Sequence, residues 1–179
     1  MIRGFEVVSK YQDQAINLPK RATKQAAGYD FESSVDMVLP SIWRFPFLKA
    51  LSTIKSTKEL SAQEISDANA TLKPYLIPTG IKAFMQPNEV LIIANRSSNP
   101  LKRGLVVPNG IGVIDADYYN NDANEGEIFI QMVNLGITDM KIKKGDRIGQ
   151  GIFMPYLTTD NDNDDLKQTR SGGFGSSGK

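Results

Sequence analysis

The apolar residues of this chain occur in short runs separated by glycine, proline and asparagine. The longest clean run, residues 90–94, has the length of a strand, and no run reaches the 18 residues of a membrane span. Residues 127–133 alternate in the period-two pattern of a half-buried strand. Short strands without long helices between them predict an all-β sandwich or barrel. The predicted strands are residues 5–9, 76–84, 90–94, 105–107, 111–115, 127–133 and 148–154.

Residues 41–74 interrupt this pattern. Between residues 56 and 72 the apolar spacing is helical, with Ile65, Ala68 and Leu72 on one stripe. Ser61 and Glu64 fit a capping box, and the proline at position 74 stops the helix. We expect an insertion whose helix lies on the β body. Four apolar residues precede the helix, and we expect them to pack rather than contact a ligand: Trp43, Phe45, Phe47 and Leu48.

The length of 179 residues suits one domain, which we expect to span residues 1–159. Residues 160–165 are all Asp or Asn, so they cannot bury themselves and predict an acidic linker. Residues 170–179 are rich in glycine and serine, which suits a flexible arm that closes over a ligand. The N-terminus lacks the layout of a signal peptide, which predicts a cytoplasmic protein.

The chain contains neither cysteine nor histidine. Disulfide scaffolds, thiol nucleophiles, Cys/His zinc sites and Ser-His-Asp triads are therefore excluded. Catalysis would have to use carboxylates, hydroxyls, Arg or Lys side chains, backbone amides and an oxygen-liganded metal such as Mg²⁺. The net charge of +1 argues against a broad nucleic-acid footprint, although it leaves room for a small anionic ligand.

Two short clusters have the composition of a ligand site. Residues 27–30, Ala-Gly-Tyr-Asp, place Asp30 just after a glycine turn. Arg96, Ser97 and Ser98 follow an apolar strand and offer a cation, two hydroxyls and loop amides to a phosphate. Taken alone, each cluster also fits a capping aspartate or a serine turn.

Residues 109–118, Asn-Gly-Ile-Gly-Val-Ile-Asp-Ala-Asp-Tyr, are more informative. Asn109 and Gly110 predict a hairpin, and the glycines permit a flat ligand to approach the backbone. Asp115 ends an apolar strand, where a partly desolvated carboxylate could act as a general base. A hairpin with a polar end explains the same residues equally well. Residues 145–150, Gly-Asp-Arg-Ile-Gly-Gln, add a turn and a strand with polar side chains.

These clusters and the glycine-rich tail, taken in order, resemble the five motifs of the trimeric dUTPase family (dUTP nucleotidohydrolase). The resemblance spans about residues 26–178 and skips the insertion. It implies a jelly-roll-like homotrimer with active sites at subunit boundaries and a C-terminal arm that closes over the nucleotide. It also implies that Asp115 activates water for attack on the α-phosphorus of dUTP, giving dUMP and pyrophosphate.

The resemblance assigns the remaining roles residue by residue. Asp30 would help to position Mg²⁺ through coordinated water. Tyr118 would pack beneath the deoxyribose and leave no space for a 2′-hydroxyl. The uracil edge would be held by Asn109, Gly112, Val113, Ile114 and Phe129. The phosphates would be held by Arg96, Ser97, Ser98 and Gln150. The tail would contribute Arg170, Phe174, Gly175, Ser176 and Ser177, with Phe174 stacked on uracil and Arg170 at the γ-phosphate.

The sequence departs from the family pattern at the insertion and in residues 119–125, which lengthen a turn that is normally short. It also departs in the tail, which has one residue fewer than usual between Arg170 and the Gly-Gly-Phe run. Two alternatives stay open. One is a dCTP deaminase-type enzyme, although residues 109–118 contain no glutamate to place beside the base. The other is a nucleotide-sensing regulatory protein that engages a protein partner through residues 41–74. No nucleic-acid or membrane partner is expected.

Overall fold

The β-strands form most of the body of the protein. The computed structural model describes residues 1–162. Its strands are β1 (Gly4–Val7), β2 (Lys20–Arg21), β3 (Tyr29–Glu32), β4 (Met37–Leu39), β5 (Tyr75–Pro78), β6 (Ile81–Phe84), β7 (Glu89–Ala94), β8 (Leu105–Val106), β9 (Ile111–Asp115), β10 (Phe129–Asn134), β11 (Met140–Ile142) and β12 (Arg147–Pro155). The single-turn helices are η1 (Ser9–Tyr11), η2 (Asn99–Arg103) and η3 (Ala116–Tyr118). This composition confirms the all-β prediction for the body.

The largest sheet has the strand order β2-β3-β12-β7-β9, and all of its neighbours are antiparallel. Smaller sheets pair β1 with β6, β11 with β4, and β10 with both β5 and β8. The strands enclose one core, whose fully buried members come from both the large sheet and the small ones. Phe31 of β3, Leu91 of β7, Ile130 of β10 and Ile148 of β12 are at most 1% exposed. Burial of these side chains fixes the large sheet against the others.

One predicted strand and one predicted hairpin are wrong, because the chain passes from one sheet to another within each of them. The segment 76–84 divides into β5 and β6, which pair with β10 and β1 respectively. The break lies at Gly80, whose φ of 70° is open to glycine without strain. The turn at Asn109 and Gly110 likewise joins β8 to β9, but β8 pairs with β10 and β9 with β7. It is therefore a link between sheets rather than the turn of a hairpin.

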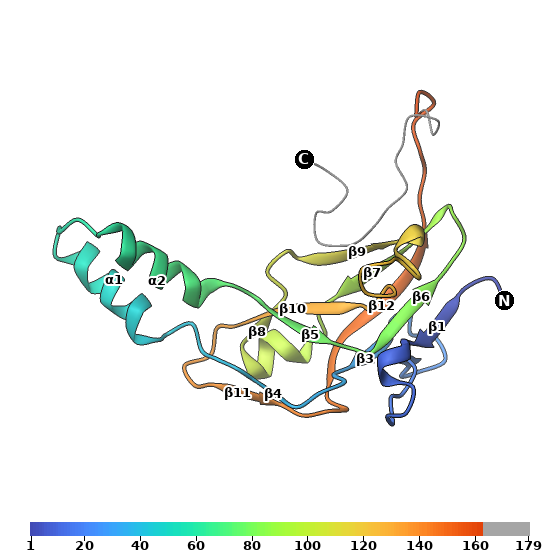
Figure 1. Cartoon of the computed structure of the whole chain (residues 1–179), viewed down its shortest axis with the longest axis horizontal. Coiled ribbons are helices and arrows are strands. Elements are labelled where there is room, and N and C mark those ends of the chain that lie inside the picture. The colour runs from blue at the N-terminus through green and yellow to red at the C-terminus, as the bar shows by residue number, and fades with distance from the viewer. Residues whose placement is uncertain (163–179) are drawn as a thin grey trace.

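The insertion contains two helices rather than the one predicted. Helix α1 (Phe45–Lys55) packs against α2 (Ala62–Leu72), and Ser61 and Glu64 form the expected capping box at the start of α2. The pair projects from the β body as a helical hairpin, so the expectation that a helix lies on the body is wrong (Figure 1). Of the predicted apolar stripe on α2, only Ala68 is buried, while Ile65 and Leu72 stay 45% and 40% exposed. The stripe is therefore not covered by the β body.

The aromatic residues at the start of α1 and just before it divide between packing and exposure. Trp43 donates from Nε1 to the carbonyl of Leu135 at 3.0 Å and meets the ring of Phe47 edge to face. These contacts agree with the expected packing role. Phe45, in contrast, is 77% exposed. Within residues 1–162, no helix is long and apolar enough to cross a membrane.

Candidate active site

An arginine cluster, formed by Asp30, Arg96 and Arg147, occupies one end of the large sheet. The Asp30 carboxylate accepts from Arg96 Nε at 2.9 Å and from Arg147 Nη1 at 3.1 Å. Both ion pairs are partly buried on the Asp30 side, whose side chain is 16% exposed. Charge-assisted bonds of this kind hold the two guanidinium groups in fixed orientations. The cluster therefore presents ordered cations beside the polar loop that follows β7.

Three paired strands bring the predicted residues of this cluster together. Asp30 of β3 lies opposite Gln150 of β12, and Gln150 lies opposite Ala94 of β7. Arg96 follows Ala94 by two residues, with Ser97 exposed and Ser98 half-buried beside it. A Cβ at Gly28 would lie 2.3 Å from Gln150 Oε1, so the glycine lets the chain before β3 approach Gln150 closely.

The loop that carries Arg96 is held by the side chains of Asn95 and Asn99, which the sequence analysis did not single out, and by that of Gln150. Asn95 donates to the carbonyl of Leu105 at 3.0 Å and accepts from Asn99 at 2.8 Å. Asn99 also donates to the carbonyl of Ile148 at 2.9 Å, and Gln150 donates to the carbonyl of Asn95 at 3.0 Å. Three of these bonds tie the ends of the Arg96–Ser98 turn to β8 and β12, and the bond between Asn99 and Asn95 joins the two ends to each other. The turn is therefore a preorganised element.

Arg147, which bonds Asp30, is a further candidate site residue that the sequence analysis did not single out. It lies opposite Glu32, while Gly149 lies opposite Phe31. The extra residue between these two pairs is a β-bulge, and it shifts the register of β12 against β3. Without the bulge, residues 147 and 150 would point to opposite faces, because side chains alternate along a strand. The available signal was the motif at residues 145–150, in which an arginine opens the strand.

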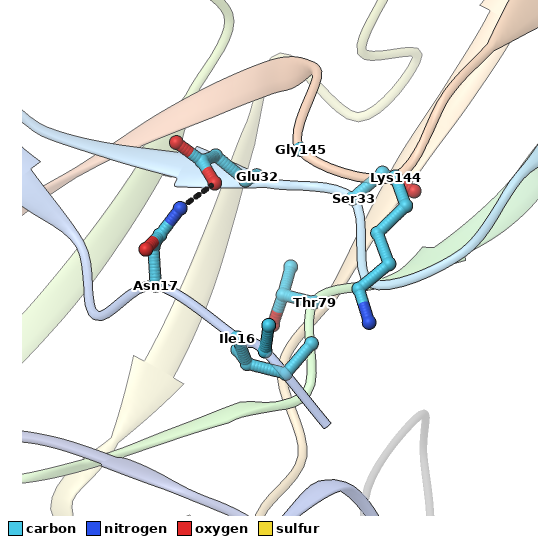
Figure 2. Close-up of a pocket in the computed structure, with 8 residues that line it drawn as sticks. Ile16, Asn17, Glu32, Ser33, Thr79, Lys144 and Gly145 are labelled. Atoms are coloured by element: carbon cyan, nitrogen blue, oxygen red, sulfur yellow. Dashed lines mark hydrogen bonds between the residues drawn. The ribbon is translucent and has the colours of Figure 1, made fainter.

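Two cavities adjoin along β3. The first, of about 250 Å³, is lined by Asn17, Leu18, Lys20, Arg21, Ala22, Asp30, Glu32 and Arg147. The second, of about 230 Å³, shares Asn17 and Glu32 with it, and Figure 2 shows Asn17 bonded to Glu32 at its edge. Lys144 and Thr79 also line the second cavity (Figure 2). The first cavity places two further cations, Lys20 and Arg21, next to the arginine cluster.

Asp115 lies in a different cavity, of about 340 Å³, which we call the Asp115 cavity. Its lining residues are Pro87, Asp115, Ala116, Asp117 and Tyr156. Asp115 is the last residue of β9, as predicted, and it is half-buried. Gly112, Val113 and Ile114 precede it on the same strand, with Asn109 exposed in the turn before β9. Phe129 lies at the start of β10, opposite Pro78.

Tyr118 is almost fully buried, with 6% of its surface exposed. It ends η3, directly after Asp115 and its two neighbours. Its hydroxyl donates to the carbonyl of Glu127 at 3.0 Å and accepts from Asn124 Nδ2 at 2.7 Å. These two bonds fix the ring of Tyr118 just after β9.

The register of the large sheet separates Asp115 from the arginine cluster. Asp115 lies opposite Val90, whereas the Asp30–Gln150 row lies opposite Ala94, at the other end of β7. Three inter-strand steps of about 4.8 Å and four residues of about 3.3 Å put the Cα atoms of Asp30 and Asp115 about 20 Å apart. One chain therefore does not bring its proposed base to its own arginine cluster.

The remaining predicted residues lie outside the described part of the chain. They are Arg170, Phe174, Gly175, Ser176 and Ser177. Within residues 1–162, no group of three or more His, Cys, Asp or Glu side chains has the arrangement to hold a metal ion by itself.

The chain is similar in sequence and in fold to proteins whose activity is known. Residues 59–178 match the family model described as dUTPase. A curated deoxyuridine 5′-triphosphate nucleotidohydrolase from Lactococcus lactis is 46% identical over 177 residues, which cover 99% of this chain and 98% of the relative. A protein of the same name from Desulfitobacterium hafniense is 32% identical over 175 residues, covering 93% and 91% of the two chains.

Solved structures that resemble this chain are also those of dUTPases. The crystal structure of dUTPase from Streptococcus mutans has a TM-score of 0.68 and 39% identity, and the match covers 88% of this chain and 99% of that one. The dUTPase from phage phi11 of S. aureus, described with a species-specific insert, has a TM-score of 0.62 and 18% identity, with coverage of 91% and 96%. The second likeness concerns the fold alone.

Proposed function

Because this chain belongs to the dUTPase family and hydrolyses dUTP to dUMP and pyrophosphate, we propose that its active sites lie between copies of the chain. In each site, Asp115 of one copy would face the arginine cluster of another. The observation that supports this arrangement is the separation of about 20 Å between Asp115 and Asp30 within one chain. A hydrolytic site needs its base and its phosphate-binding groups within contact distance of one phosphorus atom.

A contact between two different ends of the same subunit is heterologous. Repeating such a contact closes a ring when the rotation permits it. The family resemblance gives three copies for this ring, and the homotrimer is therefore part of the proposal. The Asp115 cavity is lined by two aspartates and no cation, whereas the cavity beside the arginine cluster is lined by three cations and two carboxylates, and this difference in charge supports the contact.

At the cationic side, Arg96 would bind the α- and β-phosphates together with Ser97, Ser98 and Gln150. A triphosphate carries nearly four negative charges, so its binding and hydrolysis depend mainly on charge neutralisation and alignment. Asp30 orients the guanidinium of Arg96 and that of Arg147 through its two oxygens. Each arginine keeps further N–H donors for phosphate oxygens, because a guanidinium has five.

At the other side, β9 would bind the nucleoside. The uracil edge would meet Asn109 and the backbone of Gly112, Val113 and Ile114, with Phe129 nearby. Fixed backbone donors and acceptors left unpaired by a wrong base each cost about 1–3 kcal/mol, which suits discrimination against cytosine. Tyr118 would pack beneath the deoxyribose and leave no room for a 2′-hydroxyl.

Asp115 would act as the general base. Its carboxylate would take a proton from a water molecule as the water oxygen forms a bond to the α-phosphorus of dUTP. The bond between that phosphorus and the oxygen that bridges to the β-phosphorus breaks at the same centre, and pyrophosphate leaves with the bonding electron pair. The step needs neither histidine nor cysteine, in agreement with a chain that has none.

The residues fit Mg²⁺ as an ion that arrives with the substrate. Mg²⁺ keeps several waters and is commonly bound through one or two carboxylates together with substrate phosphates. Asp30 has lone pairs beyond those used by the two arginines, so it would hold the ion through a coordinated water. The ion would supply charge neutralisation on the phosphates.

The tail residues keep the roles that the family resemblance gives them. Arg170 would bind the γ-phosphate, Phe174 would stack on uracil, and Gly175, Ser176 and Ser177 would contact the phosphates. These residues belong to the matched segment 59–178 of the family model, which supports the proposal.

A nucleotide screen tests this function. We expect rapid pyrophosphate release from dUTP, and release slower by about 100-fold or more from UTP, dCTP and dTTP, since each lacks or adds a group that the site would read. Chelation of Mg²⁺ by excess EDTA should lower the rate with dUTP at least tenfold, and added Mg²⁺ should restore it. Ammonia release from dCTP would instead support the deaminase alternative. An unchanged rate in EDTA would contradict the metal proposal.

A second role, as a regulatory protein, finds support in the helical hairpin. Its exposed apolar side chains include Phe45, Leu48, Leu51 and Ile54 of α1, each at least 42% exposed. Large exposed apolar patches often mark protein interaction sites. Pull-down from a host lysate with the full chain and with a chain lacking residues 45–72 tests this role. Equal recovery of partner proteins by both chains would exclude it.

A further inference from the structure

A nearly buried lysine contacts the segment that directly follows Tyr118 in the chain. Lys82 of β6 has 9% of its side chain exposed, and its ammonium donates to Asn120 Oδ1 at 2.7 Å and to Glu125 Oε1 at 2.6 Å. Glu6 of β1 lies 3.7 Å from the same nitrogen. The ring of Tyr119 lies 5.2 Å below it. Lys82 therefore connects β1 to the lengthened turn at residues 119–125. Together with Gly126, which follows it, we call this segment loop 119–126.

Both loop residues bonded to Lys82 adopt an unusual backbone conformation. Asn120 has a φ of 56° and Glu125 a φ of 60°, in the left-handed region. This region costs a residue such as glutamate roughly 1–2 kcal/mol, so surrounding contacts must hold it there. Ser9 adds two bonds to the Glu125 carboxylate, from its backbone nitrogen at 2.9 Å and from its hydroxyl at 3.1 Å. The bond from Lys82 keeps the pKa of Glu125 below its usual range.

The same loop holds Tyr118 from two sides. Asn124 donates to the Tyr118 hydroxyl at 2.7 Å, and Asn121 donates to the Tyr118 carbonyl at 2.8 Å. Tyr119, the next residue, donates from its hydroxyl to Glu6 at 2.7 Å. A shift of Asn120 or Glu125, the two residues that Lys82 holds, would therefore move Tyr118 through the hydrogen bonds that it forms with Asn121 and Asn124.

We propose that Lys82 is a positioning residue for Tyr118 and, acting through loop 119–126, helps the enzyme to discriminate deoxyribose from ribose. The inference rests on the proposed function, in which Tyr118 packs beneath the sugar. Rejection of a single hydroxyl depends on close packing, because a small displacement of the ring opens the space that the 2′-oxygen needs. Lys82 touches neither substrate nor reacting atoms.

The test compares kcat/KM for dUTP with kcat/KM for UTP in matched variants. Lys82→Met removes the ammonium and keeps most of the side-chain length. Asn120→Gly and Glu125→Gly each remove one acceptor, and glycine tolerates the left-handed backbone, so these variants keep the loop path. Arg3→Met is the control, because Arg3 lies just before β1 and its ion pair is with Glu89 of β7 rather than with a residue of the loop. Tyr118→Leu tests the sugar contact itself.

We expect the dUTP/UTP ratio to fall about tenfold in Lys82→Met and several-fold in each glycine variant, with no change in Arg3→Met. A fraction of unfolded enzyme lowers both rates equally and leaves the ratio unchanged, so a merely structural role predicts a constant ratio. If Tyr118→Leu lowers the ratio while Lys82→Met and both glycine variants keep it within twofold, the inference is wrong and the proposed function stands. If Tyr118→Leu also leaves the ratio unchanged, the sugar contact of the proposed function is wrong and the inference falls with it. Should Lys82→Met fail to fold, Asn120→Gly and Glu125→Gly decide the question.

Discussion

Asp115→Asn should lower kcat for dUTP hydrolysis by about 10³-fold, within the range that a positioned general base contributes. Asparagine has the shape of aspartate but cannot accept the proton from the attacking water. Asp115 closes β9 opposite Val90 at the edge of the large sheet, so an amide of equal size leaves the strand intact. Binding should survive, because the loss of one negative charge near a triphosphate does not weaken attraction. We therefore expect a large change in turnover and little change in affinity.

Pyrophosphate release measures the turnover of this variant, and calorimetry with an α,β-imido analogue of dUTP measures its affinity. Asp117→Asn is the matched control, since Asp117 lines the same cavity and has no proposed role. Retention of more than a tenth of the wild-type kcat by Asp115→Asn would contradict the assignment of the base. If Asp115→Asn stays active and Asp117→Asn shows the loss instead, the assignment of the base passes to Asp117.

Arg96→Ala should lower kcat/KM for dUTP by about 10²–10³-fold. The variant loses a cation that binds phosphate, and it also leaves the Asp30 carboxylate with one guanidinium instead of two. An anion that is less well neutralised would then face the triphosphate. Arg96→Lys should recover little of this loss, because an ammonium lacks the planar fork that bonds Asp30 and phosphate together.

The double variant Asp30→Asn/Arg96→Ala separates the two causes. If the exposed carboxylate contributes to the defect, the double variant should lose less activity than the two single losses, Asp30→Asn and Arg96→Ala, predict when multiplied, which is the coupling that a double-mutant cycle measures. Arg44→Ala is the control, because Arg44 forms an exposed ion pair with Asp139 at the base of the helical hairpin. A kcat/KM within tenfold of wild type in Arg96→Ala would contradict the phosphate-binding role.

The elements predicted well were those with local causes. The strands at residues 90–94 and 111–115 follow from their apolar runs, and α2 begins where the Ser61–Glu64 capping box predicts. The short strands β2, β3, β4 and β11 were missed because two to four residues carry no readable period. They form by pairing with distant partners; β4, for example, pairs with β11 about a hundred residues later.

The candidate site shows the same division. The sequence identified Asp30, Arg96 and Gln150 as separate clusters, and strand pairing brings them together. It did not identify Arg147, because a bulge changes the face on which that side chain lies. Nor could local patterns reveal that Asp115 lies at the opposite end of the sheet from the arginine cluster, since that distance depends on the register of β7 with both of its neighbours.

Mixing two inactive variants tests the shared site most directly. Asp115→Asn and Arg96→Ala chains are unfolded together and refolded at a one-to-one ratio, so that the two kinds of copy assort at random. If each site takes Asp115 from one copy and Arg96 from another, about a quarter of the sites in a random mixture receive both intact residues. The mixture should then recover about a quarter of the wild-type rate of pyrophosphate release from dUTP. A rate no higher than the mean of the two separate variants would contradict the account, because it would mean that both residues act within a single chain.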